Sequence, residues 1–280
     1  MKKISRRSFL AASGLTIAAL ALTACGGSAS TASSAASSVA ASSEAASTSA
    51  AAAELTTVEA GKLTMATNAA FPPYEMTTDA GEFEGIDIET AQAIADKLGL
   101  ELQIDDMDFD AALLSVQQGK ADIAMAGVTV TDERKNVMDF SDSYATGIQS
   151  IIVPEGSDIA SPDDLAGKMI GTQRGTTGYI YCSDDFGDDA VVAYDDGLTA
   201  VQALNNGQVD AVVIDNAPAK EFVAANPGLL LLDTSYAEED YAIGMAKGNT
   251  ALEDAVNAAL EELKADGTLQ SIVDKYITAE

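Results

Sequence analysis

Two charged residues that follow apolar segments have the chemistry to bind a small molecule. Arg134 lies near the end of MAGVTVTDERK, residues 125 to 135, and Asp215 ends VDAVVID. After residue 25, Arg134 and Arg174 are the only arginines. An arginine presents a planar fork of donors that matches a carboxylate, whereas an aspartate can accept hydrogen bonds from an ammonium group. Arg134 and Asp215 could therefore hold a ligand that carries both charges.

The composition excludes several kinds of chemistry. The chain has no histidine, so catalytic triads that use histidine and histidine-ligated metal sites are ruled out. Two cysteines cannot form a metal cluster or a disulfide framework. The formal net charge of −29 argues against binding to nucleic acid, which depends on cationic contacts. We expect no catalytic residues, no cofactor and no metal.

The first residues are typical of an export signal. A basic start precedes an apolar segment, residues 9 to 22, that is too short to remain across a membrane. LTAC, ending at Cys25, resembles the lipobox of bacterial lipoproteins, which implies cleavage after residue 24 and a lipid on Cys25. SRRSFL resembles a twin-arginine signal, and ordinary secretion is the alternative route. Residues 25 to 53 are rich in Ala, Ser, Thr and Gly, and we expect a flexible tether there.

Strand-like and helix-like patterns alternate from residue 54 onward, which favours an α/β fold. One pattern comes twice. Residues 109 to 127 (FDAALLSVQQGKADIAMAG) are echoed by residues 198 to 215 (LTAVQALNNGQVDAVVID), so that Asp122 corresponds to Asp210. A looser echo pairs KLTMATN with KMIGTQ. Two matches in the same order predict two similar α/β lobes.

The ends of these strands carry polar side chains. In open α/β sheets, ligands lie beyond the carboxyl ends of the strands. Asn68 and Thr129 belong to the first half of the chain, and Gln173 and Asp215 belong to the second. Two facing lobes would therefore form a cleft with Arg134 on one side and Asp215 on the other. These charges complement the carboxylate and the ammonium of a free α-amino acid.

Several stretches between Lys62 and Tyr276 resemble the extracellular solute-binding proteins of family 3, the polar amino-acid receptors of ABC importers. They are ATNAAFPPYEM, FEGIDIETAQAIADKLG, MDFDAALLSVQQGKADIAMAGVTVTDERK, DFSDSY, GTQRGTTGY and VDAVVIDNAPA. The resemblance implies a two-lobe periplasmic-binding-protein-like fold of type II, with a mixed sheet in each lobe. It implies that the ligand-binding residues are Asn68, Phe71, Phe109, Ala126, Gly127, Thr129, Arg134, Gln173, Thr176, Thr177 and Asp215.

The resemblance also implies roles for these residues. Arg134 would hold the ligand carboxylate with Thr129 and the Gly127 backbone, and Asp215 would hold the ammonium. Asn68 lies where receptors for cationic amino acids often carry an acid, so we expect a neutral polar or broadly selected amino acid rather than lysine or arginine. The lobes would close about a hinge and deliver the ligand to a membrane permease.

The expected organisation follows from the same resemblance. The signal peptide would comprise residues 1 to 24, the lipidated tether 25 to 53, the first lobe 54 to 147 with 243 to 280, and the second lobe 148 to 242. We expect a monomeric lipoprotein on the outer face of the cytoplasmic membrane or in the periplasm, with no membrane contact except its lipid.

Each assignment has an alternative. Arg134 could form a surface ion pair, and Asp215 could cap the next helix. Phe71 and Phe109 could belong to the core. Thr176 and Thr177 could end a loop. Arg174 could lie on the surface or contact an acidic ligand group. The aspartates between residues 105 and 110 resemble a calcium loop but lack its glycine and distal glutamate, which favours a solvated edge. A dehydratase on the same fold or a sensory module are the rival functions.

Overall fold

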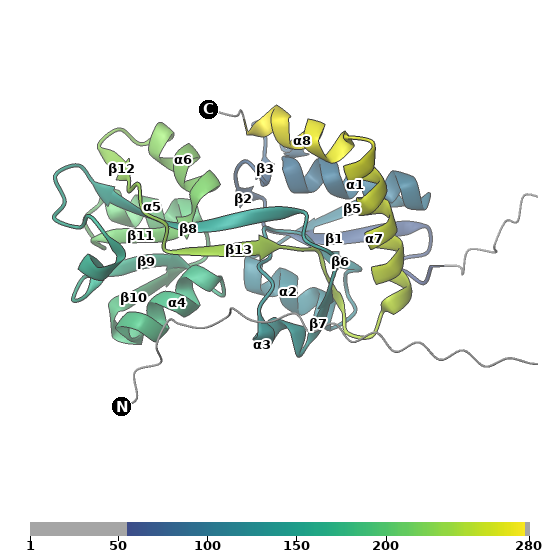
Figure 1. Ribbon diagram of the computed structural model, residues 1–280, viewed down its shortest axis with the longest axis horizontal. Helices are drawn as coiled ribbons and strands as arrows, with labels where there is room; N and C mark the ends of the chain where they lie inside the picture. Colours follow the sequence, from purple (N-terminus) through teal and green to yellow (C-terminus); the bar gives the residue numbers. More distant parts are fainter. Residues whose placement is uncertain (1–54, 278–280) are drawn as a thin grey trace, which may run out of the picture. The chain divides into compact units, whose positions relative to one another are not determined.

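The computed structural model describes residues 55–277 (Figure 1). The expected signal peptide, Cys25 and the whole of the expected tether lie outside these residues. Within the described part, no helix is both long and apolar enough to cross a membrane.

The first of two large sheets has the strand order β5–β1–β6–β14–β7. Its strands are β1 (Lys62–Thr67), β5 (Glu101–Asp106), β6 (Ile123–Ala124), β7 (Met138–Phe140) and β14 (Gly244–Ala246). Strand β1 is parallel to β5 and β6, whereas β14 is antiparallel to β6 and β7. A small antiparallel sheet contains β2 (Ala70–Phe71), β3 (Glu75–Thr77) and β4 (Phe83–Glu84).

The second large sheet has the order β10–β9–β11–β8–β12, with β13 also paired to β8. Its strands are β8 (Ala145–Pro154), β9 (Ile170–Gln173), β10 (Val191–Tyr194), β11 (Ala211–Asp215), β12 (Leu229–Leu231) and β13 (Ala237–Tyr241). Strand β9 is parallel to β10 and β11, and β8 is antiparallel to β11. Three parallel strands followed by an antiparallel one therefore occur in both sheets, and the prediction of two similar α/β lobes is confirmed.

Helices flank both sheets (Figure 1). They are α1 (Ile86–Leu98), α2 (Phe109–Gln117), α3 (Asp132–Lys135), α4 (Thr177–Phe186), α5 (Gly197–Asn205), α6 (Asn216–Ala225), α7 (Thr250–Ala265) and α8 (Thr268–Tyr276), with 3₁₀ turns η1 (Pro162–Leu165) and η2 (Asp188–Ala190). Alternate β1 residues point to opposite faces. Met65 packs in the core beside α1, and Ala66 packs in the core beside α2. The first large sheet is therefore covered on both faces.

Strands β8 and β13 carry the chain between the two sheets. They run antiparallel, with Tyr241 opposite Ala145 and Ala237 opposite Gln149. The ring of Tyr241 lies over Gly147, where an added Cβ would approach a ring carbon to 2.4 Å. A side chain at Gly147 would therefore displace the buried Tyr241 ring.

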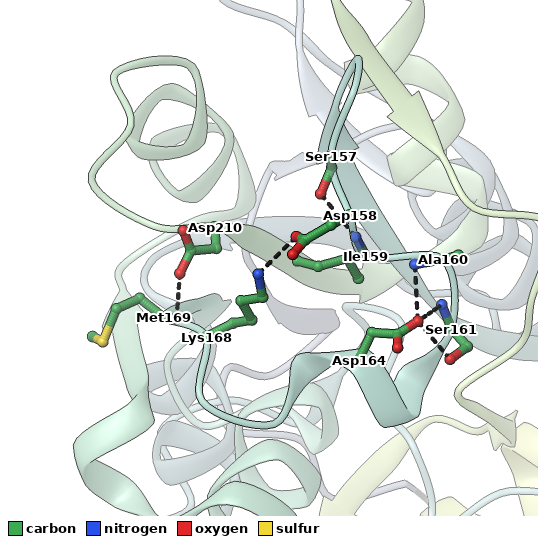
Figure 2. A network of polar contacts seen from close by, with 9 residues as sticks. All are labelled: Ser157, Asp158, Ile159, Ala160, Ser161, Asp164, Lys168, Met169 and Asp210. Atoms are coloured by element: carbon green, nitrogen blue, oxygen red, sulfur yellow. Dashed lines mark hydrogen bonds and ion pairs between the residues drawn. The ribbon is translucent and has the colours of Figure 1, made fainter.

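Each lobe contains the same pair of hydrogen bonds between an aspartate and the backbone of a residue in or next to a strand. Asp122 accepts a hydrogen bond from the Thr64 N–H (2.8 Å) and donates its own N–H to the Thr64 carbonyl (2.9 Å). Asp210 makes the same two bonds with Met169, both 2.8 Å (Figure 2). Asp122 also accepts from the Val58 N–H at 2.7 Å and is buried, whereas Asp210 is exposed. The sequence echo thus reflects one local geometry that is used twice.

We expect Asp122→Ala to reduce the free energy of unfolding by about 2 to 3 kcal/mol, since it leaves a buried N–H without an acceptor. The matched change Asp210→Ala should cost about 1 kcal/mol or less, because water can replace the exposed carboxylate. Urea unfolding of the two variants measures this difference. Equal losses would contradict the assigned difference in burial.

Candidate ligand-binding site

A single cavity brings together all eleven residues that the sequence predicted as ligand-binding. It is lined by Asn68, Phe71, Glu75, Phe109, Ala126, Gly127, Thr129, Arg134, Gln173, Thr176, Thr177 and Asp215. Its volume of about 10 Å³ has room for about one water molecule. An amino acid is much larger than a water molecule, so the cavity must widen before such a ligand can enter.

Arg134 provides a buried cation at this cavity. Its backbone N–H donates to the Thr131 hydroxyl, which caps the short helix α3 (3.1 Å). The guanidinium donates to the Thr129 carbonyl (2.7 Å) and to the Gly175 carbonyl (3.0 Å), and it lies 5.3 Å from the centre of the Phe109 ring. Arg134 is only 8% exposed. The alternative of a surface ion pair is therefore wrong.

Burial and the neighbouring carboxylates have opposite effects on the pKa of Arg134. Burial lowers the pKa of Arg134, whereas the nearby Glu239 and Asp215 carboxylates favour its charged form and raise that pKa. The guanidinium remains charged, because the ordinary pKa of arginine lies above 12. A carboxylate ligand would supply a further counter-charge to this buried cation.

Asp215 provides the opposite charge from the second sheet. It ends β11 and precedes α6, yet its carboxylate makes no capping hydrogen bond to that helix. The carboxylate instead accepts from the Gln149 amide (2.8 Å) and from the Tyr241 hydroxyl. Burial, with a smaller contribution from Glu239, raises the pKa of Asp215 to about 7, against the stabilising Tyr241 and Gln149 hydrogen bonds. An ammonium group would favour the ionised form.

Two amides tie the sheets together beside the cavity. The Gln173 amide donates to the Asn68 carbonyl oxygen (2.8 Å), and the Asn68 amide donates to the Met107 carbonyl (3.0 Å). Gln173 also donates to the Asp195 carbonyl (3.3 Å). The predicted positions at the ends of β1 and β9 therefore meet, and this contact joins residues far apart in the sequence.

Gly127 lines the cavity, but its N–H is already engaged. It donates to the buried Asp87 carboxylate (3.0 Å), which also accepts from the Tyr144 hydroxyl (2.8 Å). A ligand carboxylate would have to compete with Asp87 for this hydrogen. Gly127 has a φ of 55°, and an added Cβ would lie 2.9 Å from the Phe71 ring, so both conformation and space favour glycine here.

Thr176 and Thr177, at the start of α4 in the second lobe, combine the structural and the ligand-binding roles that were considered for them. Thr176 caps α4 by accepting from the Tyr179 N–H (3.4 Å), so it does end a loop, and it also lines the cavity. Thr177 begins α4, and its hydroxyl donates to Glu239 (2.9 Å). Phe109 likewise belongs to the core around α2 and contacts the cavity. Here the structural and functional alternatives are compatible.

Arg174 lies outside the cavity lining. Its guanidinium is half exposed and forms an ion pair with Asp195 (3.4 Å). An exposed pair of this kind contributes little to stability. Of the two alternatives for Arg174, the structure therefore matches the surface position.

Three polar residues near the cavity were not predicted: Glu75, Gln149 and Glu239. Glu75 is fully buried, its two carboxyl oxygens have no hydrogen-bond donor among the described residues, and it lines the cavity. Burial and the neighbouring Asp87 raise the pKa of Glu75 well above its usual range. An acid inside the apolar stretch FPPYEM was a signal that could have identified Glu75. Nothing comparable marked Gln149 or Glu239, which lie on the connecting strands.

Comparison with known proteins identifies the same architecture. The model for "Bacterial extracellular solute-binding proteins, family 3" matches residues 63–279. The chain belongs to this family. The match covers both lobes, and family 3 proteins are the substrate-binding components of amino-acid ABC transporters, which is the function of this chain.

Individual relatives are similar over most of their length. The L-cystine-binding protein TcyJ of Escherichia coli (strain K12) is 33% identical over 226 residues, covering 79% of this chain and 85% of that protein. The structure of an ancestral arginine-binding protein bound to arginine is 41% identical, with a TM-score of 0.74, and covers 78% of this chain and 98% of that one. The structure of an ancestral arginine-binding protein bound to glutamine is 40% identical, with a TM-score of 0.75, and covers 78% of this chain and 99% of that one. These relatives are binding proteins, and the expectation that this family 3 chain is not an enzyme is confirmed.

The ligand-free protein should lose stability as the pH rises from about 4 to about 7. Folding raises the pKa of Asp215 from 3.8 to about 7, so the native state holds this proton more tightly than the unfolded state does. Stability falls with rising pH wherever the native state binds more protons. Urea unfolding at about pH 5 and about pH 8 should differ by on the order of a few kcal/mol. In Asp215→Asn this difference should shrink, and an unchanged difference would show that Asp215 does not titrate in this range.

Proposed function

We propose that this protein captures a free polar amino acid between its two lobes, with Arg134 holding the carboxylate and Asp215 holding the ammonium. The observation that carries the proposal is the placement of these two charges. One buried cation lies between strands β6 and β7 of the first sheet, one buried anion ends a strand of the second, and both line the same cavity. A zwitterion satisfies both charges together, because a carboxylate matches the guanidinium fork and an ammonium can donate to the aspartate.

Capture requires a hinge movement. The cavity has room for about one water molecule, so the lobes must separate to admit an amino acid and close again around it. Only β8 and β13 need to bend, since they carry the chain from one sheet to the other. We propose residues 54 to 147 with 243 to 280 as the first lobe and residues 148 to 242 as the second.

The lining of the cavity supports a ligand whose side chain donates hydrogen bonds. Glu75 has two carboxyl oxygens with no donor among the described residues, and the Asn68 carbonyl oxygen, which accepts from Gln173, has a second lone pair in the same lining. The amide of Asn68 favours a neutral ligand such as glutamine, whereas Glu75 could ionise against the guanidinium of arginine. Arginine and glutamine, the ligands named in the ancestral structures, are therefore the first two amino acids to test.

Thermal unfolding with a panel of amino acids, including cystine and histidine, tests the function and the ligand class together. A ligand at a hundred times its dissociation constant adds about 2.7 kcal/mol to stability and should raise the midpoint by several degrees. A shift with glutamine but not arginine would assign a neutral ligand, and the reverse would assign a cationic one. No shift with any amino acid, from folded and ligand-stripped protein, would contradict the proposal.

Arg134→Ala should weaken the affinity for the identified amino acid by at least about thirtyfold, because removing one partner of a buried charge pair costs about 2 to 5 kcal/mol. The matched control is Lys135→Ala, which removes an exposed cation from the next position. Calorimetric titration should show near-normal affinity for the control. An Arg134→Ala affinity within threefold of wild type would rule out the carboxylate role.

We also propose that the protein is a monomeric lipoprotein, exported by means of residues 1 to 24 and anchored through Cys25. The basic start, the apolar segment and LTAC support this proposal. The tether would hold the binding domain near a membrane permease, which receives the amino acid from the closed form.

Labelling bacteria that express the full chain with a radioactive fatty acid tests the anchor. The wild-type chain should incorporate label and partition with membranes, because a lipid on Cys25 and the tether would retain it there. Cys25→Ser should do neither, whereas Cys182→Ser, which changes a buried cysteine, should retain both properties. Label on the Cys25→Ser variant would contradict the assignment.

A further inference from the structure

Glu239 lies on the connecting strand β13 and forms a polar junction between the lobes. It is 7% exposed. One carboxylate oxygen accepts from the Thr177 hydroxyl (2.9 Å), the Gln149 amide (3.0 Å) and the Thr129 hydroxyl (3.1 Å). Thr129 and Thr177 line the cavity, whereas Glu239 does not. Any hydrogen-bond effect of Glu239 on a ligand must therefore pass through these neighbours, whereas its charge acts on the cavity from behind them.

In this arrangement both threonine hydroxyls donate their hydrogen to Glu239, which decides what they can offer to the cavity. A hydroxyl has one hydrogen to donate and two lone pairs that accept, and an ionised carboxylate only accepts. With their hydrogens directed to Glu239, Thr129 and Thr177 can present only lone pairs to the cavity. Their oxygens lie 3.5 Å apart, so they form a local pair of acceptors. Such a pair suits a ligand donor and is unsuited to a ligand carboxylate.

The charges behind these hydroxyls act in the same direction. The amide nitrogen of Gln149 lies within hydrogen-bonding distance of both Asp215 (2.8 Å) and Glu239 (3.0 Å). Two carboxylates therefore converge on one side of the cavity, the side to which the ammonium is assigned. Like charges held this close favour the approach of a cation, because it reduces their mutual repulsion. Arg134 remains the donor for the ligand carboxylate.

We infer that Glu239 is a positioning residue that orients the Thr129 and Thr177 hydroxyls so that they accept from the ligand ammonium. This inference rests on the proposed amino-acid binding. It changes one expectation, since the Thr129 hydroxyl then serves the ammonium instead of the carboxylate. Glu239 acts without touching the ligand and sets the donor and acceptor pattern that selects a protonated α-amino group.

The test compares an amino acid with its analogue that lacks the α-amino group. For arginine the pair is arginine and 5-guanidinopentanoic acid, and for glutamine it is glutamine and 4-carbamoylbutanoic acid. In Glu239→Gln the side-chain amide can donate to the threonines, which frees their hydrogens to point into the cavity. We expect this variant to bind the amino acid at least about tenfold more weakly, a loss of about 1.4 kcal/mol. Binding of the analogue, measured by competition at millimolar concentration, should change by less than threefold.

Two controls separate this role from a structural one. Glu238→Gln removes the same charge from the adjacent exposed position on β13 and should leave both affinities unchanged. In a Thr129→Val, Thr177→Val background, Glu239→Gln should cause a clearly smaller further loss than in the wild type, because the hydroxyls that it orients are absent and only the effect of its charge remains. This second comparison uses only the amino acid, so it decides the matter even if the analogue binds too weakly to measure.

The outcomes are distinguishable. Equal losses for the amino acid and the analogue, or a full further loss in the double-valine background, would overturn the positioning role. An unchanged amino-acid affinity in Glu239→Gln would overturn it as well. If the wild-type protein bound no amino acid at all, the proposed function itself would fail, and that result precedes any comparison of variants.

Discussion

The guanidinium of Arg134 is held by backbone carbonyls from both halves of the molecule, Thr129 next to the first sheet and Gly175 next to the second. These two bonds place a cation at the junction of the lobes, where the nearby Glu239 and Asp215 carboxylates favour its charged form. Burying a charge is costly, and pairing offsets that cost. A ligand carboxylate would add a direct partner for the guanidinium, which the two carbonyls, with only partial charges, do not provide. Other features of the site, from the acids on the connecting strands to the amide pair, surround this one buried cation.

The strand duplication explains why the site forms at this place. Parallel strands in both lobes direct their carboxyl ends toward the same region, so the residues after β1, β6, β9 and β11 converge there. The connecting strands pass beside that region and add Gln149, Glu239 and Tyr241. A ligand site is thus built from two similar halves and from the hinge between them. Closure and recognition use the same residues, because the hinge strands contribute hydrogen bonds to Asp215 and to both cavity threonines.

Much of this arrangement could be predicted from the sequence, and the reasons are local. Gly99 ended α1 with a left-handed φ of 68°, and the spacing of Gly119 and Asp122 against Gly207 and Asp210 revealed the duplication. Cavity residues such as Asn68 and Asp215 followed from their positions at strand ends, whereas others, such as Phe71 and Thr176, came only from the family resemblance. Glu239 could not be predicted, because its contacts reach residues 62 and 110 positions away in the chain and depend on how two lobes meet. The N–H of Gly127 was expected to be free for a ligand, and only the three-dimensional position of Asp87 shows that it is shared.

The small volume of the cavity has a kinetic consequence. A compartment with room for about one water molecule is far too small for an amino acid, so cargo can enter or leave only when the lobes move. Departure of the cargo is then gated by opening, and its residence time can be no shorter than the waiting time for that motion. If a membrane permease receives the amino acid as proposed, it must favour the open form of this carrier, so that part of the work of release falls on the membrane machinery.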